Sequence, residues 1–355
     1  MQNRGNSVLE VRPEMIVQNK DRILWIDSMK LFSCLLVVVG HLYMSMEAGG
    51  WIPENVFYYC FPIQTVYAFH VPLFFVCSGF LYQRKKVDYT VNSHINNIKN
   101  KFMNLGVPYL VFTLITLGLK IIFSDSVNNQ ATPILRTVFW EPVAPYWYLY
   151  TLFFIFCIIP RQKKTKNLIW LFVVSVIVKV LYVFVPWPYT FPDVITKVAG
   201  NAVWFSFGMI LTDSHLRGKI MNRRAMSGCF IIGILLALIF YSKNNNLPSV
   251  QFIIAVLFVY AFVCFFALIV GDKGKKIINQ LNKFFMPVFL MHTIVAAGFR
   301  TVLLKAGVNS FAAHFTVGLL ISILVPAFLY EIAEKKWWLL FWMEPSKAIR
   351  LKRGK

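Results

Sequence analysis

The segment KLFSCLLVVVGH, residues 30–41, begins with a cation, ends with an imidazole and holds ten mostly apolar residues between them. In an α-helix, Lys30 and His41 would lie about 16 Å apart along the axis, and eleven steps of about 100° return both to one face. Asp27, three residues before Lys30, shares that face. The segment therefore predicts a membrane helix that carries a stripe of three ionisable side chains.

The rest of the chain is equally apolar. Of its 355 residues 58% are hydrophobic, against roughly 45–50% in soluble domains. The excess falls in blocks, and a membrane helix needs about 17–25 largely apolar residues, so we predict an all-α polytopic membrane protein with about ten spans. The first, fourth and sixth blocks are short and must extend into flanking residues or run as broken helices. The ten blocks are 31–46, 56–82, 105–123, 147–159, 168–185, 198–211, 225–241, 250–270, 284–304 and 312–330.

The net charge of +21 is unevenly distributed along the chain. Most of the 36 Lys and Arg residues lie in the segments 1–30, 83–104, 161–166, 215–224, 271–283 and 331–355. These segments occupy every second connection between spans, and the positive-inside rule then predicts that both termini are cytoplasmic. Anionic lipid headgroups account for the basic loops, so we predict membrane lipids as partners and no nucleic acid.

The predicted organisation is one membrane domain with two short flanks. Residues 1–24 form a polar cytoplasmic segment without the apolar core of a targeting signal, residues 25–330 form the transmembrane domain, and residues 331–355 form a basic cytoplasmic tail. The six cysteines contain no C-x-x-C pair. We interpret them as buried apolar residues and predict neither a metal site nor a disulfide framework.

His41 is the strongest candidate for chemistry. Ionisable groups within spans are costly and mark functional sites by default. Lys30 can extend to the headgroups, whereas a histidine near mid-membrane must face the protein interior or a water-filled channel. Histidine has an ordinary pKa of about 6.5 and can take and return a proton near neutral pH. We predict a general base at His41; the alternative is a buried histidine that only hydrogen-bonds a backbone carbonyl.

A second segment, AFHVPLFFVCSGFLYQRKK at residues 68–86, holds further candidates. Pro72 is expected to kink the helix, and His70 is a second ionisable group in a span. Ser78 and Gly79 permit close approach of another helix. We interpret Ser78 as a packing residue in preference to a nucleophile.

Four segments in order resemble the acyltransferase-3 family, which are bacterial integral-membrane O-acyltransferases that act on cell-surface sugars. The similarity spans about residues 22–330. A basic residue and a histidine with ten residues between them form the family signature, here Lys30 and His41. The similar segments are WIDSMKLFSCLLVVVGH (25–41), FHVPLFFVCSGF (69–80), PYWYLYTL (145–152) with Trp147, and PVFLMHTIV (287–295) with His292.

The resemblance implies an enzyme of the bacterial plasma membrane that transfers an acyl group, usually acetyl, to a sugar hydroxyl. The donor would be cytosolic acetyl-CoA or another short acyl-CoA, with no bound cofactor. The acceptor would be a surface polysaccharide or a lipid-linked sugar, and polysaccharide-synthesis machinery is a further possible partner. His41 would act as general base or transient acyl carrier, while Lys30 would hold a donor phosphate or, with Asp27, orient the stripe.

One motif departs from the family. Where relatives often carry R-x-x-R before a proline, this chain has IKNKFMNLGVPY at 98–109, with Lys101 and Asn104 in the two positions. Lys101, with Lys99 beside it, is the candidate donor site. Glu141 and Trp147 are candidates for acceptor binding by their predicted outward position.

A glycan transporter or flippase is the competing hypothesis, since ten spans and a polar stripe also suit that class.

Overall fold

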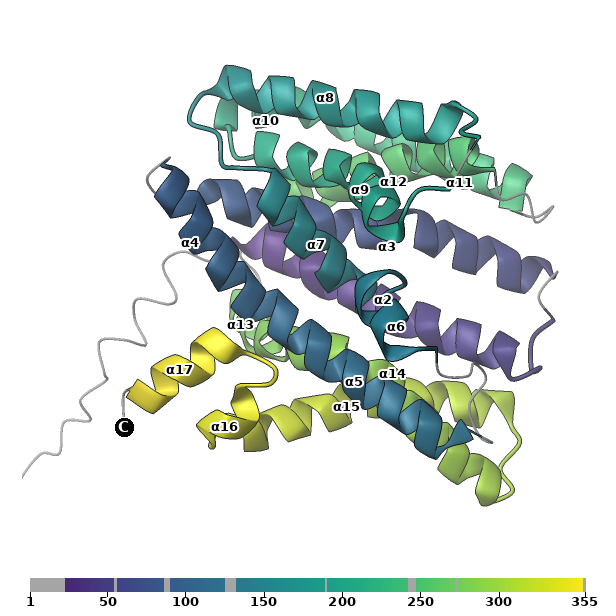
Figure 1. Cartoon of the computed structure of the whole chain (residues 1–355). Helices are drawn as coiled ribbons and strands as arrows, with labels where there is room; N and C mark the ends of the chain where they lie inside the picture. The colour runs from purple at the N-terminus through teal and green to yellow at the C-terminus, as the bar shows by residue number, and fades with distance from the viewer. Residues whose placement is uncertain are drawn as a thin grey trace, which may run out of the picture.

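The computed structural model describes residues 23–53, 56–85, 90–124, 132–188, 190–241, 247–271 and 274–353, and the predicted N-terminal segment lies almost wholly outside them. All regular structure within these ranges is helical (Figure 1). The helices are α2 (Leu24–Ala48), α3 (Phe57–Arg84), α4 (Val91–Lys101), η1 (Phe102–Gly106), α5 (Val107–Ile122), α6 (Ile134–Phe139), α7 (Trp147–Ile158), α8 (Thr165–Phe184), α9 (Asp193–Ile210), α10 (Ser214–Ile220), α11 (Arg223–Tyr241), α12 (Pro248–Ile269), α13 (Lys275–Leu281), η3 (Asn282–Phe284), α14 (Phe285–Lys305), α15 (Phe311–Ala333), α16 (Trp337–Leu340) and α17 (Pro345–Arg353).

Within the described residues, eight helices are long and apolar enough to cross a membrane, and a ninth span results if α9 and α10 are taken together. Each of the ten predicted blocks corresponds to a helix. The first block extends into flanking residues and becomes the 25-residue α2. The fourth is the 12-residue α7, and the sixth is α9, which bends by 111° into α10. The all-helical membrane fold is confirmed, while the count of ten stays a prediction.

The basic connections gather at one end of the bundle, which is the left end in Figure 1. The last turn of α3, helices α4, α10 and α13, and the tail helix α17 all lie there. We call this the basic end and the other the opposite end. The ten helices that match the predicted blocks, α7 and α9 included, alternate in direction between the two ends, as the charge distribution predicts. The assignment of the basic end to the cytoplasm remains a prediction from the positive-inside rule.

Helix α3 lies at the centre of the bundle and packs tightly on α9. A side chain on Gly79 would overlap the carbonyl oxygen of Phe205, and one on Gly208 would overlap that of Val76. Only glycine lets two helix backbones approach so closely. The expectation that Gly79 serves close packing is therefore confirmed.

The tail folds back onto the basic end. The Tyr330 hydroxyl donates a hydrogen bond to Glu344 (2.5 Å), and Lys347 pairs with Glu334 (2.5 Å). The backbone N–H of Ser346 donates to the Asn104 side chain in η1 (3.3 Å). Helices α16 and α17 thus cover the segment in which α4 passes through a π-helical turn into α5.

Candidate functional site

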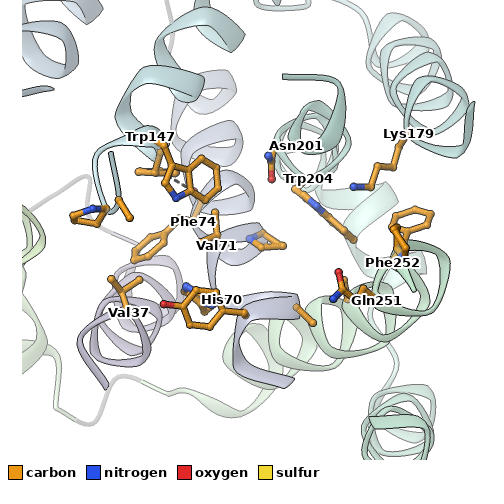
Figure 2. Close-up of a pocket in the computed structure, with 18 of the residues that line it drawn as sticks. Val37, His70, Val71, Phe74, Trp147, Lys179, Asn201, Trp204, Gln251 and Phe252 are labelled. Carbon is orange, nitrogen blue, oxygen red and sulfur yellow. Dashed lines mark hydrogen bonds between the residues drawn. The ribbon is translucent and has the colours of Figure 1, made fainter. Parts of the chain in front are cut away.

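A cavity of about 450 Å³ opens between α2, α3, α7, α8, α9 and α12. The residues of its wall lie toward the opposite end of the bundle. His41, for example, lies seven residues before the end of α2, and Gln251 lies three residues after the start of α12. Its volume lies within the roughly 300–1,000 Å³ of small-molecule sites. Figure 2 shows Trp147, Val37 and His70 on one side of the cavity and Lys179, Gln251 and Phe252 on the other.

Three histidines from three helices meet at the inner side of this cavity. His41 and His70 line it, and the ring of His292 lies 5.3 Å from the ring of His41 between centroids. Tyr67 completes the group, since its ring lies 4.7 Å from His70 and 6.3 Å from His41. The sequence pattern nominated all three histidines but did not show that they lie together.

Backbone carbonyls fix the tautomers of two of these rings. His70 Nδ1 lies 2.7 Å from the Val66 oxygen, and His292 Nδ1 lies 3.0 Å from the oxygens of Val288 and Phe289. A carbonyl only accepts, so Nδ1 carries the hydrogen in both rings. The buried Nε2 of His292 then presents a lone pair that has no partner among the described residues.

His41 differs from its two neighbours. Its ring forms no hydrogen bond to any residue that the structure describes, and it borders the cavity directly. His70 and His292 each hydrogen-bond a backbone carbonyl, whereas His41 hydrogen-bonds none that the structure describes. The alternative interpretation of His41, as a histidine that only bonds a carbonyl, therefore fits the other two histidines and not His41. Both ring nitrogens of His41 are without a hydrogen-bond partner among the described residues, and the ring can exchange a proton with a molecule bound in the cavity.

Lys30 and Asp27 pair at 3.8 Å on the first turns of α2, as their spacing predicts. Lys30 Nζ also stands 4.7 Å over the ring of Phe285. The cavity does not extend to Lys30, because the packed rings of Phe74, Phe285 and Phe289 lie at this level. Along α14, the rings of Phe285, Phe289 and His292 form a row from Lys30 to His41.

The two candidate donor lysines differ in their surroundings. Lys101 turns into the bundle and stands 3.8 Å over the ring of Phe156, whereas Lys99 is exposed. Phe156 packs on Tyr82, and the Arg161 guanidinium stacks 4.1 Å from the Tyr82 ring. Arg161, which the sequence pattern did not nominate, therefore joins Lys101 in a group of cations at the basic end.

The two candidate acceptor residues separate in the structure. Trp147 lines the cavity from the first turn of α7, whereas Glu141 lies outside its wall and pairs with Arg136 (2.6 Å) on the exposed surface. Ser78 also lies outside the wall, and its hydroxyl hydrogen-bonds that of Tyr148 (2.9 Å). This contact agrees with the interpretation of Ser78 as a packing residue.

Sequence reasoning missed the polar wall formed by Lys179, Asn201 and Gln251, together with Trp204. Lys179 carries a signal that would have revealed it, because a lysine inside an apolar span is costly. The amides carry none, since only the fold brings α8, α9 and α12 together. Within the described residues no group of three His, Cys, Asp or Glu side chains could hold a metal ion.

The geometry places an imidazole without a hydrogen-bond partner among the described residues at the wall of a cavity lined by aromatic rings in a membrane bundle. Comparison with known families gives one match, the acyltransferase domain, over residues 23–331. No curated protein and no solved structure matches the chain. Because the matched region covers nearly all of the bundle, from the start of α2 to the last turns of α15, the chain belongs to the acyltransferase-3 family and is a multi-pass membrane acyltransferase.

Proposed function

We propose that the protein is an O-acetyltransferase of the bacterial plasma membrane that modifies a hydroxyl of a surface polysaccharide or a lipid-linked sugar. Acetyl-CoA, or another short acyl-CoA, is the donor. The observation that carries the proposal is the position of His41 at the wall of the cavity, with no hydrogen bond to the described residues. The membership of the chain in a family of acyltransferases supports it.

In the proposed reaction His41 acts as a general base. The acceptor hydroxyl oxygen attacks the thioester carbonyl carbon while His41 takes the hydroxyl proton. The carbon–sulfur bond then breaks, and the departing thiolate of CoA takes the proton back from His41. Proton transfer by a positioned side chain contributes roughly 10²–10⁴-fold to the rate. In the variant route, a His41 nitrogen attacks the thioester carbon and the carbon–sulfur bond breaks as the CoA thiolate leaves. The acceptor hydroxyl then attacks the acyl group, the acyl–nitrogen bond breaks, and the hydroxyl proton neutralises the thiolate.

The cations of the basic end support a donor that enters from the cytosol. CoA is a polyanion and is attracted by a basic surface. Lys101 stands over Phe156, and Arg161 stands over Tyr82, which packs on Phe156. Lys30 lies deeper, since Cys77, five residues before Tyr82 on α3, contacts the backbone of Ile26. The donor phosphates would bind at Lys101 and Arg161, and the acyl arm would extend past Lys30 along the Phe285 and Phe289 rings.

The acceptor is proposed to enter from the other side. The cavity opens in the half of the bundle away from the basic loops. Trp147 and Trp204 contribute indole rings to its wall, and flat aromatic faces with a few polar groups are typical of ligand sites. A sugar bound there would present a hydroxyl to His41.

The test uses membrane vesicles supplied with radiolabelled acetyl-CoA, with variants at matched expression. We expect His41→Ala to lose at least ~100-fold in acyl transfer to glycan, the lower limit for a general base. His215→Ala, which changes an exposed histidine on α10, is the control and should match the wild type. If His41→Ala transfers label normally while glycan still crosses the membrane, the transporter hypothesis replaces the enzyme. Label on wild-type protein without acceptor, absent from His41→Ala, would identify the acyl-carrier route.

A further inference from the structure

Lys179 is a cation inside a membrane-spanning helix, and it faces the cavity. It lies on α8 five residues before the end at Phe184. Its sequence neighbours Ile177, Val178 and Val180 are exposed on the outer surface of the bundle, where lipid would contact them. Lys179 turns the other way, toward α9 and α12 (Figure 2). The side chain is therefore directed into the cavity and not along the lipid surface.

The surroundings of the ammonium group make room for a ligand. A Cβ on Gly200 would lie 3.7 Å from Lys179 Nζ, so the ammonium group lies close to the backbone of α9 at Gly200. The rings of Tyr182 and Phe252 lie 5.7 and 5.3 Å from Nζ. Asn201 and Gln251 add amide groups to the same wall. Hydrogen-bond donors and one positive charge thus converge on one side of the cavity.

Lys179 contrasts with two other cations near this end of the bundle, each of which forms an ion pair. Lys197 pairs with Asp193 on α9, and Arg136 pairs with Glu141. Lys179 forms no ion pair with any described residue. An unpaired charge in a membrane interior is expensive and marks a substrate or ion pathway. A bound anion would supply the partner that the protein does not.

We propose that the side of the cavity formed by Lys179, Asn201 and Gln251 binds an anionic substituent, a carboxylate or a phosphate, of the acceptor glycan. The Lys179 ammonium group would form a charge-assisted hydrogen bond with the anion, while the sugar lies against Trp204 and reaches the histidines on the other side (Figure 2). The acceptor would then be an acidic sugar or a sugar phosphate, because a neutral sugar leaves Lys179 unpaired. This step rests on the proposed function, since it names the substrate class for the same cavity.

The test measures equilibrium binding and uses no donor, so it is independent of acyl transfer. The full chain in neutral-lipid nanodiscs is titrated with methyl glucuronide, glucose 1-phosphate and methyl glucoside, with binding followed by saturation-transfer NMR. We expect one of the anionic probes to bind about tenfold more tightly than methyl glucoside, and this identifies the anion; a tenfold difference corresponds to 1.4 kcal/mol. Equal binding of all three sugars would overturn the proposal.

Two pairs of variants separate charge from fold. Lys179→Met should abolish the preference for the anion, whereas Lys120→Met, at a lysine within α5 that does not line the cavity, should keep it. Gly200→Asp should also abolish it, because the new carboxylate lies within reach of the ammonium group. Gly200→Asn has nearly the same size and should keep the preference. Retained preference in both Lys179→Met and Gly200→Asp would overturn the proposal.

Two further results keep the inference apart from the proposed function. His41→Ala should keep the preference for the anionic probe over methyl glucoside, and a kept preference supports the inference even if no variant transfers label. Transfer to a neutral glycan with the same KM in wild type and Lys179→Met would overturn the inference and leave the acyltransferase intact. Retention of an anionic phospholipid through Lys179, seen by native mass spectrometry and not displaced by the sugars, would also overturn it.

Discussion

Helices α3 and α9 touch at one end and separate at the other. Toward the basic end, Gly79 and Gly208 bring the two backbones into contact. Toward the opposite end, the same helices contribute His70 from α3 and Asn201 and Trp204 from α9 to the wall of the cavity. At the crossing, the two glycines have no side chains that would hold the helices apart. Farther toward the opposite end, larger side chains keep the two backbones apart and face the cavity. The same two helices are therefore in backbone contact toward the basic end and border the cavity toward the opposite end.

The contrast extends to the charges. At the basic end Lys347 bonds to Glu334 and Tyr330, and Lys283 pairs with Glu331. Around the cavity, His41 and Lys179 have no hydrogen-bond or ion-pair partner among the described residues. Polar groups buried without partners are costly, so they indicate groups kept for a ligand. The paired charges hold the tail and α13 side of the bundle together at the basic end, whereas the two unpaired groups border the proposed acceptor site.

The largest expected effect comes from forcing the two helices apart at their contact. In Gly208→Ala the new methyl group meets the Val76 carbonyl oxygen on the backbone of α3, which cannot move without shifting the helix. Overpacking costs about 1–3 kcal/mol and occasionally more, and we expect the upper end of this range here. Thermal unfolding in detergent, followed by circular dichroism, measures the change.

The control for this substitution is Gly228→Ala on α11, where nothing lies within 4 Å of the added methyl group. In a helix interior, alanine is favoured over glycine by about 1 kcal/mol, so Gly228→Ala should leave the protein equally or more stable. If Gly208→Ala were as stable as Gly228→Ala, the two helices could not be in backbone contact, and the contrast between the two ends of α3 and α9 would be wrong.

The second prediction concerns the donor and the basic end. A hydrogen bond to a charged group contributes about 1.5–3 kcal/mol, so Lys101→Met should raise the KM for acetyl-CoA roughly 10- to 150-fold. The KM for the acceptor should not change. Lys99→Met removes an exposed charge only two residues away and should leave both constants near wild type. Equal effects of the two substitutions would indicate general electrostatic attraction instead of a site at Lys101.

Part of this arrangement could be predicted from the sequence. Spacing alone placed Asp27 beside Lys30, and the Ser78-Gly79 pair indicated a close helix contact. Block lengths also identified α7 and α9 as irregular spans. These features depend on residues near one another in the chain, where helical periodicity determines which side chains share a face.

Other features depend on which helices are neighbours, and periodicity does not reveal that. Lys179, Asn201 and Gln251 come from three separate helices, and no local pattern joins them. Glu141 illustrates the reverse case. Its chain position beside aromatic residues suggested a sugar site, but the chain turns so that its carboxylate meets Arg136. Its role in acceptor binding stays a prediction, and the contacts favour a surface ion pair.

The smallest expected effect separates these two acceptor candidates. Trp147→Leu removes an indole ring from the cavity wall and should raise the acceptor KM about tenfold, the equivalent of 1.4 kcal/mol. Glu141→Gln should leave the acceptor KM unchanged, because exposed ion pairs contribute little to stability and the carboxylate lies outside the cavity wall. Both constants come from initial rates at saturating acetyl-CoA. If Glu141→Gln raised the acceptor KM and Trp147→Leu did not, the sugar would bind on the loop before α7, and the space between α3 and α9 would need another occupant.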